Sequence, residues 1–500
     1  MLFRIISKFL VLLLVSGLFS SKRLQNCLEV DSLIKQRISE DQYDKAYVVA
    51  KGNRKMEGKE GCNASFYYNL GKIFLSFDDF NKTRDMYSKA LKEASEGEEY
   101  NTIKLEYSRL SFLLSEISFI KQIYENDQDK EKAISSYIGL LEGNNLWDNG
   151  EPYVDINKNL AFDDNEEFTD WNFPDIGYLH LLISDIYKKS EDFNNAIYHL
   201  REALSINPNV KSYNEQIAVI SKMIAKQANN LLRLNKLDEA IEKYELSISI
   251  DSTESAIHYN LANTYFQKKD YKKAIESYKN VEVLDPNKFK ALHKMGQCYQ
   301  KLDEHSYAVV QFQKSIDVIQ ALNENFMSSY NEMALSLMKL NDYENARKAL
   351  RTIINKSPKY FKAYETLGVL CLEATDPNFK SNECALENFT EASNLKPNNH
   401  VLKFRLAQLY NIIAEEYKDD QDLKNMNYNL NEAKKYARQC RQLKKTYGGA
   451  YFELGVAELN LCNRATGIKS LQKAAKYDRR YRSEVKRIIK KIDTFTDHCE

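Results

Sequence analysis

Three alanines recur at 34-residue intervals, and an aromatic residue follows each of them by four positions: Ala240 and Tyr244, Ala274 and Tyr278, Ala308 and Phe312. A period of this length fits a unit of two antiparallel helices. Such a unit cannot bury its apolar face alone, so successive units must stack on one another. The spacing therefore predicts an all-α fold, an α-solenoid whose function depends on the surfaces that it offers.

Two copies of this unit abut between Ser255 and Leu322. In the first copy, two apolar stripes at helical spacing end at Pro286, and the second copy repeats the stripes. Small residues stand at the same two places in both copies: Ala262 and Ala274, then Gly296 and Ala308. Because a bulky side chain would force crossing helices apart, we expect the paired helices to approach most closely at these places.

This pattern resembles the tetratricopeptide repeat family, which has a small residue at the eighth position, Ala at the twentieth, an aromatic residue at the twenty-fourth and Pro at the thirty-second. Further copies lie around Gly71, Ala196, Ala334, Gly368, Ala407 and Gly455, and weaker ones around Ala46 and Ala133. The resemblance covers most of the chain and implies about nine to ten helix pairs. Extra residues at Asp376–Glu383 and Glu415–Leu430 are expected to form loops.

The composition agrees with a helical array, because 16 Gly and 7 Pro in 500 residues leave few helix breakers. Lys and Arg together number 71, and so do Asp and Glu. This balance argues against an electrostatic grip on nucleic acid, which needs a basic face. The chain carries no H-E-x-x-H, G-x-S-x-G, Walker or G-x-G-x-x-G motif, so we predict that it is not an enzyme. His258 stands at a packing position and is expected to be a core residue.

One basic cluster lies near the carboxyl end and comprises Arg479, Arg480, Arg482, Lys486, Arg487, Lys490 and Lys491. Val485, Ile488 and Ile489 are interleaved with these residues. We expect a capping helix with a solvated outer face, because the terminal repeat of a solenoid needs a polar cover. An anionic membrane surface is the alternative role of this cluster.

The chain opens with Arg4 and Lys8, an apolar stretch from Phe9 to Phe19, and small residues within and after its end. This order is typical of a secretory signal peptide. The apolar stretch is shorter than the roughly 20 residues that span a bilayer, so we expect removal rather than anchoring. The mature protein is predicted to lack a transmembrane segment and to be exported to a periplasm, a cell surface or the medium. The endoplasmic reticulum lumen is the alternative.

Eight cysteines and four N-x-Ser/Thr sequons bear on the compartment. The sequons are as many as an Asn-rich chain gives by chance and decide nothing: Asn63, Asn81, Asn355 and Asn388. In an oxidising compartment the shortest closures join Cys27 to Cys62 and Cys371 to Cys384. Buried, unpaired thiols are the alternative for three cysteines near helical core positions: Cys298, Cys371 and Cys440.

The helical period stops between Asn144 and Asn172, where acidic residues dominate. Within this stretch, oxygen-bearing groups stand at positions 1, 3, 5, 7, 9 and 12 of a calcium-type loop: Asp155, Asn157, Asn159, Ala161 through its carbonyl, Asp163 and Glu166. The spacing resembles the D-x-N-x-N loops of dockerin-like and EF-hand proteins, which implies a Ca²⁺ site. Leu160 departs from the pattern, because the sharp turn normally requires Gly there. A solvated acidic linker is the alternative.

The first helices of three units, starting at Ser221, Ser255 and Phe289, are expected to line a concave groove. Four polar residues point to peptide binding in this groove: Asn229, Asn260, Lys290 and Lys294. They match four places of the carboxylate clamp by which some members of the family hold an acidic peptide C-terminus. Ala225 takes the place of the remaining lysine, and ordinary polar solvation of the groove is the alternative.

These observations predict five regions: a signal peptide at 1–20, a degenerate N-terminal repeat block at 24–143, the acidic insertion at 144–173, the main solenoid at 177–478, and a basic capping helix and tail at 479–500. The predicted function is an exported, non-catalytic scaffold that binds a protein or peptide partner in its groove, stabilised by calcium. One alternative is a polysaccharide-binding or accessory subunit of an envelope enzyme. Another is a co-chaperone of the endoplasmic reticulum lumen.

Overall fold

The computed structural model describes residues 27–40, 42–52, 62–142, 173, 176–208 and 210–492, and every regular element in these ranges is a helix. The first helices are α2 (Cys27–Ser39), α3 (Tyr43–Gly52), α4 (Ala64–Leu75), α5 (Phe80–Glu93), α6 (Glu98–Asp127), α7 (Lys130–Glu142), α8 (Gly177–Lys189), α9 (Phe193–Ile206) and α10 (Lys211–Arg233). They are followed by α11 (Leu237–Ile250), α12 (Ser255–Lys268), α13 (Tyr271–Leu284), α14 (Phe289–Lys301), α15 (His305–Ala321), α16 (Ser328–Lys339), α17 (Tyr343–Lys356) and α18 (Phe361–Glu373). The last are α19 (Asn382–Leu395), α20 (His400–Asp419), α21 (Leu423–Leu443), α22 (Gly448–Asn460), α23 (Arg464–Tyr477), the 3₁₀ turn η2 (Arg479–Tyr481) and α24 (Arg482–Lys490).

The described residues group into two compact units. The first unit holds the residues up to 226 together with 249–251. The second unit holds 227–248 and the residues from 252 onward. All four residues predicted to bind a peptide belong to the second unit.

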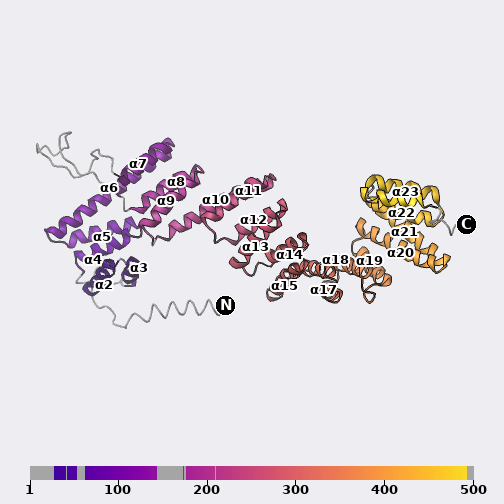
Figure 1. Ribbon diagram of the computed structural model, residues 1–500. Helices are drawn as coiled ribbons and strands as arrows, with labels where there is room; N and C mark the ends of the chain where they lie inside the picture. The colour runs from indigo at the N-terminus through magenta and orange to yellow at the C-terminus, as the bar shows by residue number, and fades with distance from the viewer. Residues whose placement is uncertain are drawn as a thin grey trace. The chain divides into compact units, whose positions relative to one another are not determined.

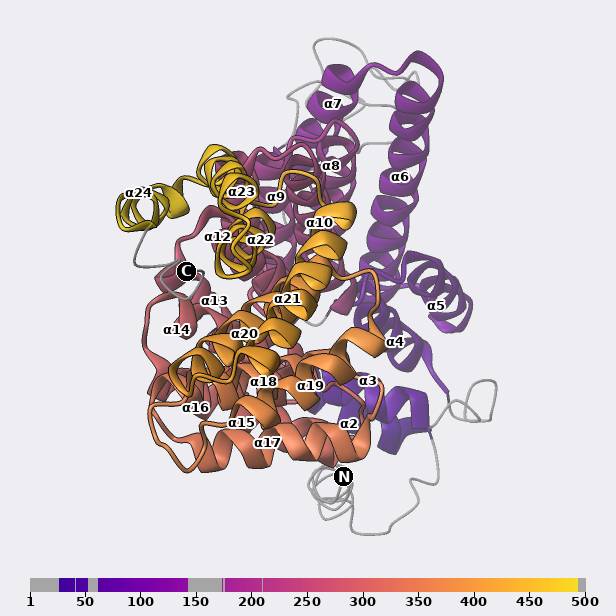
Figure 2. The ribbon, with the colours of Figure 1, turned by 90° about the vertical axis from the view of Figure 1, so that its right-hand side faces the viewer.

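Within each unit, helices that follow one another in the chain pack against each other. In the second unit α12 packs on α13, α14 on α15, α18 on α19 and α22 on α23 (Figure 1). The second helix of a pair also contacts the first helix of the following pair, as α13 does α14 and α15 does α16. In the first unit α4 pairs with α5 and α8 with α9, and the long helix α6 contacts α7 (Figure 2). This succession of nearest-neighbour contacts confirms the predicted all-α solenoid.

Small residues mark the places where paired helices cross. The residues of the 34-residue period are all fully buried: Ala240, Tyr244, Ala274, Tyr278, Ala308 and Phe312. A Cβ atom added to Gly296 would lie 2.6 Å from the ring of Phe312, so a larger residue would push this ring aside. Gly71 meets the ring of Tyr87 in the same way, at 2.3 Å. The predicted close approach of the paired helices is confirmed.

A residue with left-handed backbone conformation joins the two helices of most pairs. The residues with positive φ at these turns are Asp78, Gln128, Glu191, Asn235, Lys269, Asp303, Asn341, Gln421 and Cys462. At six of these turns the next residue is an aspartate whose carboxylate accepts a hydrogen bond from a backbone N–H of the second helix: Asp79, Asp129, Asp192, Asp270, Asp342 and Asp422. The left-handed residue ends the first helix and the carboxylate caps the second, which keeps the turn short.

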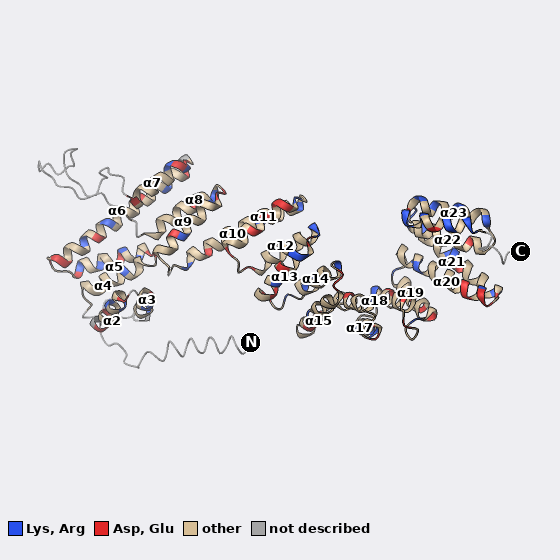
Figure 3. Cartoon of the chain, viewed as in Figure 1, with Lys and Arg blue, Asp and Glu red and all other residues tan. Residues whose placement is uncertain are grey.

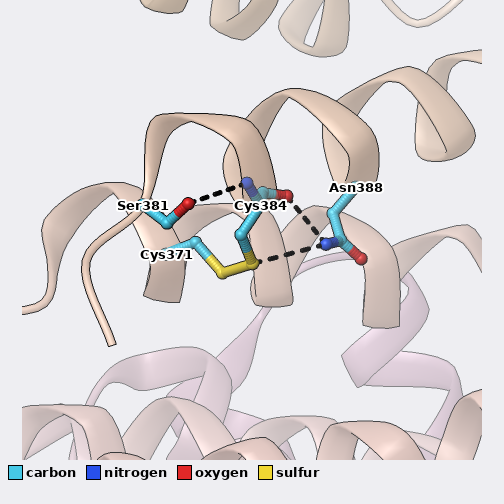
Figure 4. The surroundings of a disulfide bond; sticks show 4 residues. All are labelled: Cys371, Ser381, Cys384 and Asn388. Carbon is cyan, nitrogen blue, oxygen red and sulfur yellow. Dashed lines mark hydrogen bonds between the residues drawn. A yellow bond between two sulfur atoms is a disulfide. The ribbon is translucent and has the colours of Figure 1, made fainter. Parts of the chain in front are cut away.

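The pair α18 and α19 is joined differently. Its connection, residues 374–381, is longer and contains no residue with positive φ. Cys371 in the last turn of α18 forms a disulfide with Cys384 in the first turn of α19, and their Cα atoms lie 5.9 Å apart (Figure 4). The Oγ atom of Ser381 caps α19 by accepting a hydrogen bond from the Cys384 N–H at 3.1 Å. The disulfide therefore holds the two helix ends that a short turn holds in other pairs.

This bond confirms the predicted closure of Cys371 with Cys384. The alternative of an unpaired thiol is wrong for Cys371. It is correct for Cys298 and Cys440, which are buried and free.

One expectation about loops is wrong. The extra residues at Glu415–Leu430 lengthen α20 and α21, which reach 20 and 21 residues, instead of forming a loop. The added turns bury apolar residues of their own, Met426 and Leu430, which join a cluster with Ala414. Helix continues there because it has a core to pack on. The extra residues at Asp376–Glu383, by contrast, do lie in the α18–α19 connection and the start of α19.

The last helix covers the end of the second unit. Val485, Ile488 and Ile492 pack against Leu459 and Leu471 of the preceding pair. This is the packing expected of a capping helix.

His258 is also packed as the sequence predicts. It is 5% exposed, and its Nε2 atom lies 3.1 Å from the Ser252 carbonyl oxygen. It is therefore a core residue with a hydrogen-bond partner.

Candidate functional site

A row of side-chain contacts joins the first helices of neighbouring pairs in the second unit. Each contact links one first helix to the next, from α10 to α22. In chain order the contacts are Asn229–Asn260 (α10 to α12), Phe266–Lys294 (α12 to α14), His293–Ser329 (α14 to α16), Asn331–Thr366 (α16 to α18), Glu373–Arg405 (α18 to α20) and Asn411–Glu453 (α20 to α22). We call the surface formed by these helices and residues the first-helix face. The predicted groove positions lie on it.

The structure brings two of the four predicted peptide-binding residues together. Nδ2 of Asn260 donates a hydrogen bond to Oδ1 of Asn229 over 3.4 Å. The hydroxyl of Tyr244 donates to the same oxygen over 2.6 Å. One repeat further along, Tyr278 donates to Oδ1 of Asn263 over 2.7 Å. The tyrosine of the 34-residue period thus fixes the asparagine that lies 15 residues before it.

The protonation of Tyr244 suits this role. Burial raises the pKa of Tyr244 to about 12, so its phenol keeps the proton at neutral pH and remains a donor. Oδ1 of Asn229 accepts hydrogen bonds from Tyr244 and Asn260. The Nδ2 group of Asn229 is therefore the part of this side chain that can donate a hydrogen bond to a ligand.

The two predicted lysines lie one turn apart on α14. Nζ of Lys294 donates to Oε1 of Gln297 over 3.1 Å and lies 4.9 Å from the centre of the Phe266 ring. Lys290 is exposed, and its Nζ lies 5.8 Å from the ring centre of Phe289. The lysines thus contact aromatic rings and a glutamine, while the asparagines contact each other. Three successive first helices carry the four residues.

A buried carboxylate on the same face was not predicted. Glu453 stands in its repeat where Asn260 and Lys294 stand in theirs, and it is 6% exposed. Nδ2 of Asn411 donates to Oε2 of Glu453 over 2.8 Å, and burial raises the pKa of Glu453 to about 7. Oδ1 of Asn411 is buried without a hydrogen-bond partner among the described residues. The sequence does carry a signal, because Glu453 precedes the small residue Gly455 by the same two positions.

The predicted calcium ligands lie outside the described residues: Asp155, Asn157, Asn159, Ala161, Asp163 and Glu166. Phe173, at the end of the insertion, is described and buried, with its ring stacked on Phe112 at 6.3 Å. Within the described ranges, no group of three or more His, Cys, Asp or Glu residues is arranged to hold a metal ion. The calcium site therefore stays a prediction.

The predicted signal peptide, residues 1–20, also lies outside the described ranges. In the part of the chain that the structure describes, no helix combines the length and the apolar character that crossing a membrane requires.

Family profiles match four segments of the chain. The profile described as "TPR repeat" matches residues 228–268 and 262–303, and two profiles described as "Tetratricopeptide repeat" match residues 178–210 and 332–360. All four predicted peptide-binding residues lie within 228–303.

Two curated proteins share part of the sequence. The chain is 24% identical over 243 residues to "TPR repeat-containing protein MJ1428" of Methanocaldococcus jannaschii, which is 48% of this chain and 35% of that protein. It is 27% identical over 100 residues to "DnaJ homolog subfamily C member 7 homolog" of Dictyostelium discoideum, which is 20% of this chain and 17% of that protein. The chain spans about a third or less of the length of these relatives.

The crystal structure of yeast Tom70 is similar to this chain with a TM-score of 0.37 and 15% identity, over 94% of this chain and 96% of that chain. The profile matches and the helix pairing agree on the repeats themselves. Residues 178–210, 228–303 and 332–360 of this chain are therefore similar to tetratricopeptide repeats.

Proposed function

We propose that this chain is an exported, non-catalytic scaffold that holds a protein or peptide partner on the first-helix face. The hydrogen bond between Asn229 and Asn260 carries the proposal. It joins two first helices, within a segment that matches the repeat profile, through the amides that the sequence assigns to peptide binding. Stacked repeats expose one helix of every pair along an extended surface, which suits an extended partner. The non-catalytic role rests on a sequence without a recognised catalytic motif.

The proposed ligand group is the carboxylate at the end of an acidic peptide. Asn229 keeps its Nδ2 group as a donor, because Tyr244 and Asn260 occupy its oxygen. Lys290 and Lys294 bring two positive charges on a neighbouring first helix. Amides and ammonium groups together suit a carboxylate, since hydrogen bonds between charged groups are shorter and stronger than neutral ones.

Export is supported by cysteine chemistry as well as by the signal-like start of the chain. Cys371 and Cys384 have a Cα separation of 5.9 Å, within the range that disulfides adopt. Cys62 and Cys462 each take part in a further disulfide. Disulfides persist in oxidising compartments and are rare in reducing ones. An exported setting also favours the proposed Ca²⁺ loop between Asp155 and Glu166, because extracellular calcium is sufficient for a weak site.

A co-chaperone role is the second candidate. A similarity of 25% identity over 150 residues to the "DnaJ homolog subfamily C member 7 homolog" of Schizosaccharomyces pombe favours it. The shared part is 29% of this chain and 31% of that protein, so this role is proposed for the repeats alone.

Affinity capture tests the proposed function. The full chain, immobilised and exposed to the exported fraction of its own cells, is expected to retain one defined protein. The double variant Lys290→Ala, Lys294→Ala should lose this protein. A matched variant, Lys272→Ala with Lys279→Ala, removes two exposed lysines of α13 and should retain it. Capture of glycan without a protein would overturn the proposal in favour of the polysaccharide-binding alternative.

A further inference from the structure

Positive charge is concentrated at the carboxyl end of the second unit. Residues 464–492, which form α23, η2 and α24, contain eleven Lys or Arg residues and two Asp or Glu residues. The chain as a whole has 71 of each kind, so the rest of the sequence is net acidic. Figure 3 shows Lys and Arg gathered on α23. We call residues 464–492 the basic end surface.

The two acidic residues of this surface are already used. Asp478 pairs with Arg480 at 2.6 Å, and Glu484 pairs with Arg487 at 2.5 Å. Seven other cations are exposed and form no ion pair with the described part of the chain: Lys469, Lys473, Lys476, Arg479, Lys486, Lys490 and Lys491. Their charge is therefore available to a partner.

The need for a polar cap does not explain this charge. A cap needs a polar outer face, and residues of mixed sign provide one. The first described pair, α2 and α3, shows such a mixture: Glu29, Asp31 and Asp44 against Lys35, Arg37, Lys45 and Lys51. The basic end surface differs from this first pair because almost all of its charged residues are positive.

The arrangement of the cations favours a broad, flat partner. On α23, Lys469, Lys473 and Lys476 recur at i, i+4 and i+7 and so share one side of the helix. On α24, Lys486 and Lys490 are four residues apart in the same manner. The two helices pack on each other, so the two sets of exposed lysines lie on adjacent helices.

The apolar side of α24 excludes insertion. Val485 is 4% exposed and Ile488 is 2% exposed, because both pack on Leu459 and Leu471. A helix that inserts into a bilayer must present an apolar side to the lipid. Contact at this surface is therefore electrostatic and peripheral.

We propose that the basic end surface docks on a membrane that bears anionic lipid. Such a membrane presents distributed negative charge over a wide plane, which lysines match as mobile point charges. The most directional contacts to an anion come from forked guanidinium groups, and two of the arginines of this surface, Arg480 and Arg487, are already paired within the chain. The proposal is independent of the peptide-binding function, because it uses none of the residues of the first-helix face.

Vesicle co-sedimentation of the full chain tests this proposal. Vesicles of phosphatidylcholine with 30% phosphatidylserine should bind the chain at low salt, and vesicles of phosphatidylcholine alone should not. Each lysine near an anionic surface contributes about fivefold to affinity, so Lys486→Glu with Lys490→Glu should lower it by at least about 25-fold. Lys272→Glu with Lys279→Glu changes the net charge by the same amount on α13 and should bind like the wild type.

Three outcomes would overturn the proposal. One is equal binding to neutral vesicles, and another is unchanged binding of the Lys486, Lys490 variant. The third is binding of soluble polyglutamate without binding of anionic vesicles, which would assign the surface to an acidic protein. Thermal melting of each variant shows that it is folded before vesicles are added.

Discussion

The hydroxyl of Tyr244 donates a hydrogen bond to Oδ1 of Asn229 over 2.6 Å, between the two helices of one pair. Tyr278 and Asn263 repeat this bond at 2.7 Å in the next pair, and Phe312 takes the same place one pair later without a hydroxyl. An aromatic ring at this place is therefore a packing requirement, and the hydroxyl is an addition that orients a polar residue of the first-helix face.

Replacing Tyr244 by Phe should keep the packing of the aromatic ring and remove the hydrogen bond that orients Asn229. The chain tolerates Phe at the equivalent place, so the variant should fold and lose about 1 kcal/mol for the missing hydrogen bond. Affinity for an acidic peptide should also fall, because Asn229 is no longer fixed. Tyr278→Phe is the matched control, since Asn263 is outside the proposed site. Equal peptide affinity of wild type and Tyr244→Phe by fluorescence anisotropy would refute the orienting role.

The disulfide between Cys371 and Cys384 should contribute strongly to stability. It closes a sequence separation of 13 residues, and a cross-link of that length stabilises by about 3 kcal/mol through the unfolded state. Cys371→Ala with Cys384→Ala should lower the thermal midpoint accordingly. Cys298→Ala with Cys440→Ala removes two buried sulfur atoms but no cross-link, and so measures the cost of lost packing. If both double variants melt alike, the cross-link adds nothing.

Replacing Glu453 by Gln should remove a pH dependence of stability. Burial raises the pKa of Glu453 from 4.5 to about 7, so between these values the folded state keeps a proton that the unfolded state releases. This contribution to stability is fully present below pH 4.5 and is lost as the pH rises through 7. Wild type should therefore lose about 3 kcal/mol relative to Glu453→Gln across this window.

Melting temperatures measured from pH 5 to pH 8 check this dependence. Glu391→Gln changes an exposed position of α19, and its melting temperature should vary with pH as that of the wild type does. A constant difference between wild type and Glu453→Gln at every pH would contradict the raised pKa.

Replacing Ala274 by Leu tests the repeat register. Ala274 is fully buried where two helices cross, and overpacking such a place costs on the order of 1–3 kcal/mol. Ala256→Leu makes the same change at an exposed position of α12 and should leave the melting curve almost unchanged. An unaltered melting curve for Ala274→Leu would show that the register is wrong.

The repeats were predictable because their rules are local. A small residue and an aromatic residue in register, as in Gly296 and Phe312, reflect contact between two helices close in sequence. The burial of His258 and the closure of Cys371 with Cys384 were predictable for the same reason, since spacing alone brings each group to its partner.

Other features depend on contacts that spacing does not encode. The extra residues at Glu415–Leu430 remain helical because Met426 and Leu430 find a core to pack on. Glu453 is buried because its partner Asn411 lies 42 residues earlier, on the preceding first helix. The bond between Tyr244 and Asn229 required the rotation of both helices to be known.

Peptide binding with a blocked carboxylate tests the central claim most directly. Fluorescence anisotropy compares labelled peptides that end in acidic residues, with a free or an amidated C-terminus, on the full chain. We predict that the free carboxylate binds at least tenfold more tightly, because a hydrogen bond to a charged group contributes about 1.5–3 kcal/mol. Lys290→Ala with Lys294→Ala should abolish this difference, and Lys272→Ala with Lys279→Ala should preserve it. Equal affinity of the free and amidated peptides for the wild type would contradict the account.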